Sequence, residues 1–393
     1  MISGENEQSF KKHKKHTDLK RPSLGNFGRN EWAIVGAPCD AIKLLAGQVI
    51  AALSPLYKCA YVDTTHSDAL LPGRLANGAD IEFTDQLNYT QINQKPAFNA
   101  VKIKETFAQA DLVLANGNHH QAKAQVVVID KNKEASLQKR LTQLTNVQLI
   151  LLAGDAGDLF DFIKDAIPDW SKIPVYRQGE TGKIISFFKE KLEEARPQLN
   201  GLVLAGGKSE RMGFDKGSVN LNGKEQRYHV ADMLKPFCNE VFISCRADQR
   251  EDITGDYISL PDTFTGLGPF GAILSAFRER PDSAWLVVAC DLPLLTEKTL
   301  DHLAENRNTA TIATAFQSNF DDFPEPLITI WEPKSYAVLL SFLARGYSCP
   351  RKVLINSDIA LLNAPSPEEL TNVNTPEDLE KVKNILHQKI IAE

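Results

Sequence analysis

The chain of 393 residues lacks any apolar run near the ~20 residues that a membrane-spanning helix needs. Its six cysteines are scattered without a CxxC pair, which favours reduced thiols over a disulfide framework or a zinc site. No apolar stretch follows the N-terminal lysines, so the pattern of a secretory signal is missing as well. We therefore expect a cytoplasmic protein without a membrane segment.

An excess of positive charge is also missing. The formal net charge is −6, and this balance argues against bulk binding of nucleic acid. Apolar residues make up 43% of the chain and charged residues 24%, which is ordinary for globular domains. At this length the chain is expected to form two domains.

The chain divides into a tail and two α/β regions. Residues 1–30 are polar and basic, so we expect a solvated, flexible tail; an arm that reaches an anionic partner is the alternative. Short apolar runs alternate with helical segments over residues 31–195 and predict a parallel α/β sheet. Residues 196–198 mark a boundary, because the residue before Pro197 resists helix.

Residues 199–393 form the second α/β region. Its repeated order of strand, loop and helix predicts a doubly wound, mostly parallel sheet. The expected fold is therefore α/β with two Rossmann-like domains. The strands predicted for the second domain are 201–204, 240–245, 258–260, 285–289, 309–315 and 327–331.

Residues 204–216, which read LAGGKSERMGFDK, are the most informative stretch of the chain. They follow an apolar run and match neither the P-loop GxxxxGK[ST] nor the pattern GxGxxG. Glycines let the backbone approach a ligand, and successive N–H groups form an anion-binding concavity. Arg211 and Lys216 add fixed positive charge for phosphate oxygens. Together these features predict a site for a nucleoside triphosphate.

Acidic residues follow two other predicted strands. Asp291 comes after the apolar run 285–288, where a carboxylate can hold Mg²⁺ together with substrate phosphates. Asp262 ends another strand, just before glycines that open a helix whose N-terminus can receive an anion. Helix capping by Asp291 and a plain turn after Asp262 are the structural alternatives. Because ligands of open parallel sheets bind outside the carboxyl ends of the strands, we expect both carboxylates at one edge.

Residues 199–393 resemble the molybdenum cofactor guanylyltransferases of the MobA-like nucleotidyltransferase family. The matching pieces are LAGGKSERMGFDKG, LPDTFTGLGPFGAI, ACDLP, FPEPLITIW and NVNTPEDL, in the family's order. In the last piece Thr375, Pro376 and Asp378 also read as an ordinary helix start.

The resemblance implies a role for each matching position. Arg211 and Lys216 would contact the triphosphate, Asp291 would bind Mg²⁺, and Asp262 would lie on the nucleotide side. The wall around guanine and its ribose would be formed by Leu204, Ala205, Gly206 and Gly207.

The resemblance matches fewer residues on the pterin side of the site. Asn372 and Asn374 match positions expected near a pterin substrate. The basic candidates Arg345, Arg351 and Lys352 align only loosely with the family.

The first α/β region resembles a decayed form of the P-loop in the molybdopterin-guanine dinucleotide accessory protein (MobB-like). Residues 35–43 occupy the place of that loop, but Ala41 stands at its second glycine. Ile42 and Lys43 stand at its lysine and hydroxyl positions, so nucleotide hydrolysis is not expected. Dimerisation, partner docking and holding the pterin remain open. A metal could be suggested by Asp63, His66, Asp68 and His119-His120, but their spacing fits no ligand pattern.

The predicted reaction is Mg²⁺-dependent transfer of GMP from GTP to the phosphate of molybdopterin, with release of pyrophosphate. Lys216, Arg211 and Asp291 are the expected catalytic residues. GTP and molybdopterin are the expected partners, and cofactor-assembly proteins or apo-molybdoenzymes are further candidates. The alternatives are transfer from CTP to the pterin, transfer from an NTP to a sugar phosphate, and a non-catalytic assembly scaffold. The sequence leaves open molybdenum versus tungsten and the oligomeric state.

Overall fold

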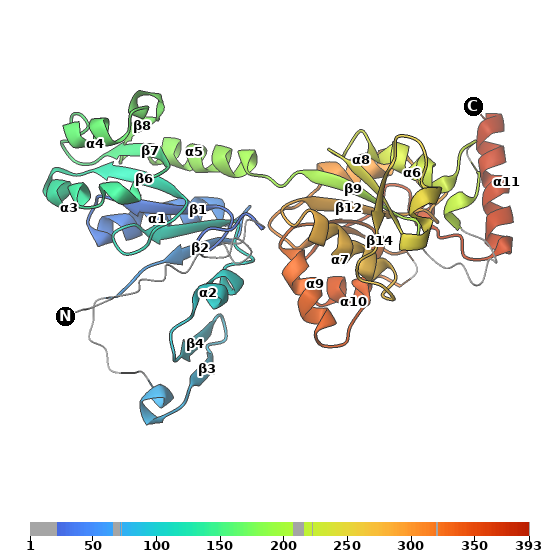
Figure 1. Cartoon of the computed structure of the whole chain (residues 1–393), viewed down its shortest axis with the longest axis horizontal. Helices are drawn as coiled ribbons and strands as arrows, with labels where there is room; N and C mark the ends of the chain where they lie inside the picture. Colours follow the sequence, from blue (N-terminus) through green and yellow to red (C-terminus); the bar gives the residue numbers. More distant parts are fainter. Residues whose placement is uncertain are drawn as a thin grey trace, which may run out of the picture.

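The computed structural model describes residues 22–65, 71, 73–206, 216–221, 223–319 and 321–392. Two α/β domains lie side by side, and a short segment between α5 (Thr181–Glu194) and β9 (Leu199–Leu204) joins them (Figure 1). Each domain is built around one sheet with helices on both faces. Among the helices in these ranges, none is both long enough and apolar enough to cross a membrane.

The N-terminal sheet has the strand order β2-β5-β1-β6-β7-β8, and its neighbouring strands pair in parallel. Its central strands are buried at every residue, as expected for a parallel sheet that helices cover on both faces. The strands are β1 (Glu31–Val35), β2 (Cys59–Val62), β5 (Leu112–Asn116), β6 (Ala124–Ile129), β7 (Val147–Leu152) and β8 (Val175–Arg177).

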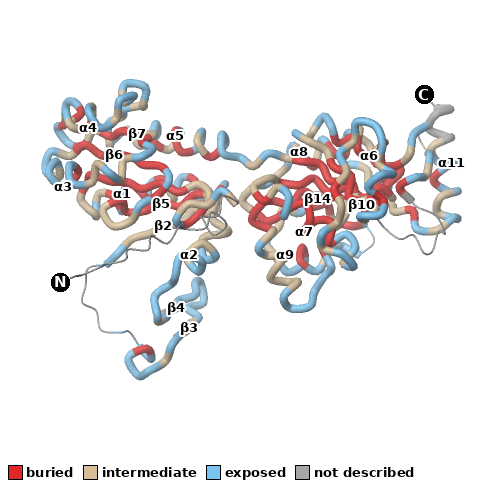
Figure 2. The backbone as a smooth tube through the Cα atoms, in the orientation of Figure 1, coloured by how far each residue is buried: buried red, intermediate tan, exposed pale blue. Residues whose placement is uncertain are grey.

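Two apolar layers cover the faces of this sheet. Helices α1 (Cys39–Leu53) and α5 pack on one face around Trp32 and Phe188. The short helices α3 (Glu134–Gln138) and α4 (Asp161–Ala166) contribute to the layer on the other face. Figure 2 shows the resulting buried sheet, with an exposed extension formed by α2 (Ala100–Thr106) and the hairpin of β3 (Ile81–Asp85) and β4 (Thr90–Gln94).

The C-terminal sheet has the order β11-β10-β9-β12-β14-β13-β15. Strands β11, β10, β9 and β12 are parallel, whereas β14 runs antiparallel to both of its neighbours. The prediction of a doubly wound, mostly parallel sheet is confirmed. Besides β9, the strands are β10 (Val241–Cys245), β11 (Ile258–Pro261), β12 (Ala284–Ala289), β13 (Ala313–Gln317), β14 (Pro324–Trp331) and β15 (Ala360–Leu362).

Alternate residues of the central strands point to opposite faces, so the sheet carries two cores. Leu286 and Val288 of β12 belong to the core that includes α6 and α8. Trp285 and Val287 of the same strand belong to the core that includes α7, α9 and α10. The helices are α6 (Gln226–Leu234), α7 (Pro269–Glu279), α8 (Glu297–Glu305), α9 (Ser335–Leu343), α10 (Pro350–Ile355) and α11 (Pro376–Ala392).

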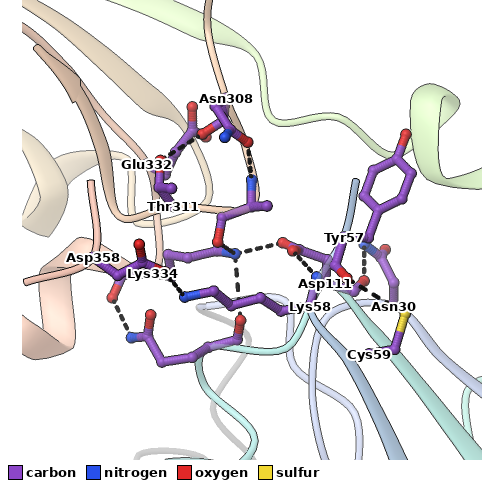
Figure 3. A network of polar contacts seen from close by, with 12 residues as sticks. Asn30, Tyr57, Lys58, Cys59, Asp111, Asn308, Thr311, Glu332, Lys334 and Asp358 are labelled. Atoms are coloured by element: carbon purple, nitrogen blue, oxygen red, sulfur yellow. Dashed lines mark hydrogen bonds and ion pairs between the residues drawn. The ribbon is translucent and has the colours of Figure 1, made fainter. Parts of the chain in front are cut away.

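A network of polar contacts joins the two domains (Figure 3). At its centre Lys334 Nζ lies 2.5 Å from Asp111 Oδ1, and only 8% and 13% of these side chains are exposed. The Lys334 ammonium also donates to the carbonyl oxygens of Gln109 and Ala310, so three acceptors surround it. Burial lowers the pKa of Lys334, and the Asp111 carboxylate opposes that shift. Because a buried charge needs such partners, this pair is expected to set how the domains meet.

The last part of the predicted tail is not a solvated segment. Phe27 is buried, and the Glu31 carboxylate accepts hydrogen bonds from the backbone N–H groups of Asn26, Phe27 and Gly28. Arg29 forms an ion pair with Asp282 of the other domain. The composition of the tail is polar on average, but one aromatic residue and one buried carboxylate are enough to fold residues 22–30 against the domains. Residues 1–21 lie outside the described ranges.

One predicted strand was placed several residues too early. The sequence interpretation put it at 309–315, whereas β13 is Ala313–Gln317. Residues 308–311 instead form a turn, in which Thr311 Oγ1 donates to the carbonyl oxygen of Asn308. Threonine favours strands, but its hydroxyl also stabilises turns, and the turn is the outcome here.

Candidate functional site

The candidate site lies where the C-terminal sheet changes its direction of winding. Strand β9 is followed by β10 and β11 on one side of it, and the chain then crosses to β12 on the other side. In open α/β sheets the carboxyl ends beside such a switch point form a crevice that binds ligands. The two strand ends are in contact here, because the backbone N–H of Cys290 donates to the carbonyl oxygen of Leu204.

The described start of the glycine loop follows β9 directly. Leu204 ends the strand, Ala205 is buried, and Gly206 lies against the end of β10. A Cβ on Gly206 would come 3.2 Å from the backbone nitrogen of Arg246 and from the Cα of Cys245. Glycine is therefore favoured by close packing at this position. Gly207 and Arg211 lie outside the described residues.

Arg246 is a cation of this edge that the sequence analysis missed. It follows β10, and its guanidinium donates to the carbonyl oxygen of Gly206 and to the carboxylate of Asp248. A basic residue directly after a parallel strand beside the glycine strand is the signal that could have identified it.

The chain re-enters the described range at Lys216, which begins the 3₁₀ turn η6 (Lys216–Ser218). Just after this turn, Val219 and Leu221 line the same cavity as Asp291 and Pro293. The segment that carries Lys216 is thus packed next to the carboxylate at the end of β12.

Asp291 lies two residues beyond the end of β12. Its carbonyl oxygen accepts a hydrogen bond of 2.9 Å from the backbone N–H of Val373. Its side chain is half-buried, and the Oδ1 atom is buried. The hydrogen bond brings the segment of Asn372 and Asn374 to the switch point.

Asp262 lies at the same edge, beyond the end of β11. Ser244 Oγ donates to Asp262 Oδ1 at 2.8 Å. Burial raises the pKa of Asp262, and the Ser244 hydrogen bond partly offsets this. Strands β10 and β9 separate β11 from β12, so the two strand ends are about 14 Å apart at the usual spacing between strands. Asp262 and Asp291 are therefore placed at opposite ends of the crevice.

The two asparagines differ in exposure. Asn372 is half-buried, and its Oδ1 has no hydrogen-bond partner within the described part of the chain, whereas Asn374 is exposed. The helix start predicted after them is confirmed. Thr375 and Asp378 exchange hydrogen bonds between their side chains and backbone N–H groups, and α11 begins at Pro376.

Gln226, the first residue of α6, lines the cavity beside Asp291 and was not predicted. Only 2% of it is exposed, and among the described residues neither Oε1 nor Nε2 has a hydrogen-bond partner. A buried amide without partners destabilises a fold by roughly 1–3 kcal/mol. A buried amide of this kind is expected at a position where the residue serves ligand binding rather than the stability of the fold. A glutamine before an aromatic residue in a helix gives no sequence signal of this kind.

The loosely aligned basic residues lie on and beside α9 and α10. Arg351 forms ion pairs with Asp321 and with Glu325, near the beginning of β14. Since β14 is antiparallel to β12, it begins at the edge where β12 ends. Arg345 donates to the Ser341 carbonyl oxygen, and Lys352 Nζ lies 5.4 Å from the ring centroid of Tyr347.

The P-loop position of the N-terminal domain differs from a phosphate-binding loop. Strand β1 ends at Val35 and α1 begins at Cys39, which leaves three residues between them. Ile42, at the position of the P-loop lysine, is fully buried in the core. Lys43 points toward Asp63, with Nζ and Oδ2 3.7 Å apart. Neither side chain is placed to hold a triphosphate.

The residues that could suggest a metal do not assemble into a cage where they are described. Asp63 accepts hydrogen bonds from Tyr61 and Asn116, and His120 is paired with Thr64. Within the described ranges, no three His, Cys, Asp or Glu side chains converge on a common point. His66 and Asp68 lie outside these ranges.

Comparison with known proteins finds a family match in the C-terminal half of the chain. The model of the MobA-like NTP transferase domain matches residues 201–359. A curated molybdenum cofactor guanylyltransferase from a Shewanella species is 30% identical over 199 residues, which cover 49% of this chain and 98% of the relative.

A longer relative is the molybdenum cofactor biosynthesis bifunctional protein of Synechocystis. It is 31% identical over 197 residues, and this alignment covers 50% of the present chain and 57% of that protein. The chain thus spans little more than half the length of this relative. Among solved structures, a MobB protein homologue from Bacillus stearothermophilus aligns with 42% of this chain and 99% of its own, at 18% identity and a TM-score of 0.30.

Proposed function

Because the chain belongs to the MobA-like NTP transferase family of nucleotidyltransferases, we propose that it transfers GMP from GTP to the terminal phosphate of molybdopterin. The observation that carries this proposal is the meeting of four motif segments at the switch point of the C-terminal sheet. They are the end of β9, the turn at Lys216, the loop at Asp291 and the segment of Asn372.

The residues present at this edge fit a magnesium ion. Asp291 offers a hard carboxylate donor beside the glycine loop, and Mg²⁺ binds through one or two carboxylates plus substrate phosphates and water. When bound, Mg²⁺ would supply positive charge that offsets the repulsion between the two phosphate groups.

The protein's own contribution is positioning and charge compensation. The acceptor phosphate is already an anion, so its attack on the α-phosphorus of GTP needs no strong general base. Backbone N–H groups of the glycine loop, with Lys216 and Arg211, would hold the triphosphate so that pyrophosphate leaves in line with the attack. Asp291 would hold the metal, and Asp262 would lie toward the nucleoside.

Asn372 and Asn374 are proposed to face the pterin. Their segment is tied to Asp291 through the backbone of Val373, so an acceptor bound there would lie next to the proposed metal ligand. Leu204, Ala205 and Gly206, with Gly207, would line the nucleoside pocket at the end of β9.

The N-terminal half is proposed to be a MobB-like domain that does not hydrolyse nucleotide. The short turn after β1 and the burial of Ile42 support this assignment. Molybdenum-cofactor assembly proteins or apo-molybdoenzymes are its proposed partners.

Pyrophosphate release from each of the four common NTPs, with and without isolated molybdopterin, tests the reaction. We expect release that requires both GTP and molybdopterin. Release with CTP in place of GTP would assign the enzyme to cytidylyl transfer, and release with a sugar phosphate in place of the pterin would contradict the proposed acceptor.

A further inference from the structure

A thiol and an imidazole meet at the carboxyl edge of the N-terminal sheet, away from the nucleotidyltransferase site. Cys39 Sγ lies 3.4 Å from His119 Nε2, and Cys39 is half-buried. The side-chain amide of Asn118 donates to Cys39 Sγ at 3.7 Å and to the carbonyl oxygen of Ala37 at 2.9 Å. A nucleophile, a base and a group that fixes the turn are therefore assembled in one place.

Gly117 lets the turn after β5 approach β1, and Gly36 lets the turn after β1 approach β6. Gly36 has a φ of 97°, and a Cβ there would lie 2.3 Å from the carbonyl oxygen of Val128. A Cβ on Gly117 would lie 2.8 Å from the carbonyl oxygen of Ile34. The turn after β5 can thus lie directly against the turn between β1 and α1. The strand ends hold Cys39 and His119 together, although they are far apart in the sequence.

The sulfur also lies at the N-terminus of a helix. Cys39 is the first residue of α1, a helix of 15 residues whose N-cap, Pro38, makes no side-chain cap. The positive end of the helix dipole lies at that position. These helix features alone do not define a site; the imidazole within reach of the sulfur does.

Other charged and titratable groups around the pair are engaged with each other. Lys43 of α1 faces Asp63, which also accepts a hydrogen bond from the Tyr61 hydroxyl. Asp40 follows Cys39 and is exposed. Among the described residues, Arg140 donates to the Asn118 carbonyl oxygen, and His120 is paired with Thr64.

We propose that Cys39 and His119 form a nucleophilic thiol site that undergoes exchange with small uncharged disulfides. A nucleophile and a base within hydrogen-bond reach, in a partly exposed position, are the signature of an activated side chain. Sulfur electrophiles suit the site better than phosphate esters, because the Asp63 carboxylate lies nearby and Lys43 is directed toward it.

The exchange step is balanced within the site. His119 accepts the proton of the Cys39 thiol, and the thiolate attacks one sulfur of the disulfide. A new S–S bond to Cys39 forms as the original S–S bond breaks. The displaced thiolate takes the proton from His119 and leaves as a thiol, so Cys39 is oxidised to a mixed disulfide and the leaving sulfur is reduced.

The test is the labelling rate of each cysteine in the full-length protein by dithiodipyridine at about pH 7, followed by peptide mass spectrometry. Cys349, which is exposed, is the reference thiol in the same molecule. We expect Cys39 to react at least ~10-fold faster than Cys349, a gain within the range that a positioned base gives. Cys39→Ser removes the fast phase, whereas Cys349→Ser keeps it.

The role of the imidazole is tested separately. His119→Gln is expected to lower the Cys39 rate to that of Cys349, and added imidazole is expected to restore it in His119→Gly. Cys59 is a half-buried thiol of the same domain, like Cys39, and burial raises its pKa to about 11, so it is the matched control and is expected to label slowly. Equal rates for Cys39 and Cys349 in the wild type, or a Cys39 rate unaffected by His119→Gln, would overturn the proposal.

Discussion

The carboxyl edges of the two sheets have a similar topology but carry different residues. Each has a parallel strand that leads into a turn at its carboxyl end, beside a switch in the direction of winding. In the C-terminal domain the turn after β9 belongs to the glycine-rich segment 204–216, and Asp291 follows the neighbouring β12. In the N-terminal domain the turn after β1 has three residues and leads directly into α1.

The difference shows that strand order determines where a site lies but not which reaction or ligand its residues suit. Glycine-rich loops can wrap backbone N–H groups around a phosphate, whereas the three-residue turn after β1 is too short to do so. We therefore propose a triphosphate site at the C-terminal edge only. The N-terminal edge holds a thiol, an imidazole and a carboxylate instead, so we expect separate chemistries at the two edges.

The largest effect is expected from the carboxylate at the end of β12. Asp291→Ala should lower nucleotidyl transfer by at least ~10³-fold, because the metal that offsets phosphate charge would be lost. Asp63→Asn, at the corresponding edge of the N-terminal domain, is the matched control and should leave transfer unchanged. Pyrophosphate release measures both, and near-normal turnover of Asp291→Ala would remove this residue from the metal role.

A similar pair of lysines tests the cations. Lys216→Ala should lower turnover by roughly 10²-fold or more, because it removes fixed charge from the triphosphate. Lys43→Ala should have no effect on transfer, since Lys43 faces Asp63 in the other domain. A loss below about tenfold for Lys216→Ala, in the same pyrophosphate assay, would contradict its assignment.

The contact between the domains provides the next comparison. Lys334→Met leaves the Asp111 carboxylate without its ion-pair partner and should destabilise the protein by about 3–5 kcal/mol. Lys58→Met removes a more exposed pair with Asp358 and should change stability by less than about 1 kcal/mol. Urea unfolding measures both free energies, and equal effects would show that burial does not distinguish the pairs.

Gln226→Leu should separate stability from activity. The change removes two buried polar atoms that lack partners, so the free energy of unfolding should rise by roughly 1–3 kcal/mol. Nucleotidyl transfer should fall if the amide serves a ligand. Gln226→Ala, which leaves a gap, is the control and should destabilise the protein. A loss of stability in Gln226→Leu would show that the amide has partners in the fold.

Substitution of Asp262 is expected to have the smallest effect on stability, and this effect depends on pH. Its folded-state pKa is raised by burial, so ionisation in the folded state is unfavourable. The stability that its protonated form provides is fully present below the unfolded pKa of about 3.9 and is lost as pH rises through the folded pKa. Asp262→Asn should therefore gain thermal stability over the wild type from about pH 4 toward pH 7. A gain in thermal stability that is the same at every pH would argue against burial of the ionised carboxylate as its cause.

Sequence patterns predicted the elements that carry strong local signals. The apolar runs of β1 and β12 are buried strands, and Thr375-Pro376 with Asp378 starts a helix as expected. The placement of Asp262 and Asp291 at one edge also followed from strand ends. Close in space but distant in sequence, Cys39 and His119 were missed as a pair because only tertiary packing of Gly36 and Gly117 brings them together.

Other features could not be read from the sequence for a related reason. Gln226 has no motif of its own, and its significance comes from burial beside other strands. The position of Arg246 after β10 was a signal, but its contact with Gly206 appears only in the fold. The polar composition of residues 1–30 concealed the single buried Phe27 and the ion pair of Arg29. Local sequence propensity predicts neither a long-range contact nor the burial of a single side chain.

The stoichiometry of GTP binding to the full-length protein, measured by titration calorimetry with Mg²⁺ present, tests the central comparison most directly. We predict one GTP per chain, with binding weakened strongly by Lys216→Ala and unchanged by Lys43→Ala. Two GTP molecules per chain, or a single site that responds to Lys43→Ala and not to Lys216→Ala, would contradict it.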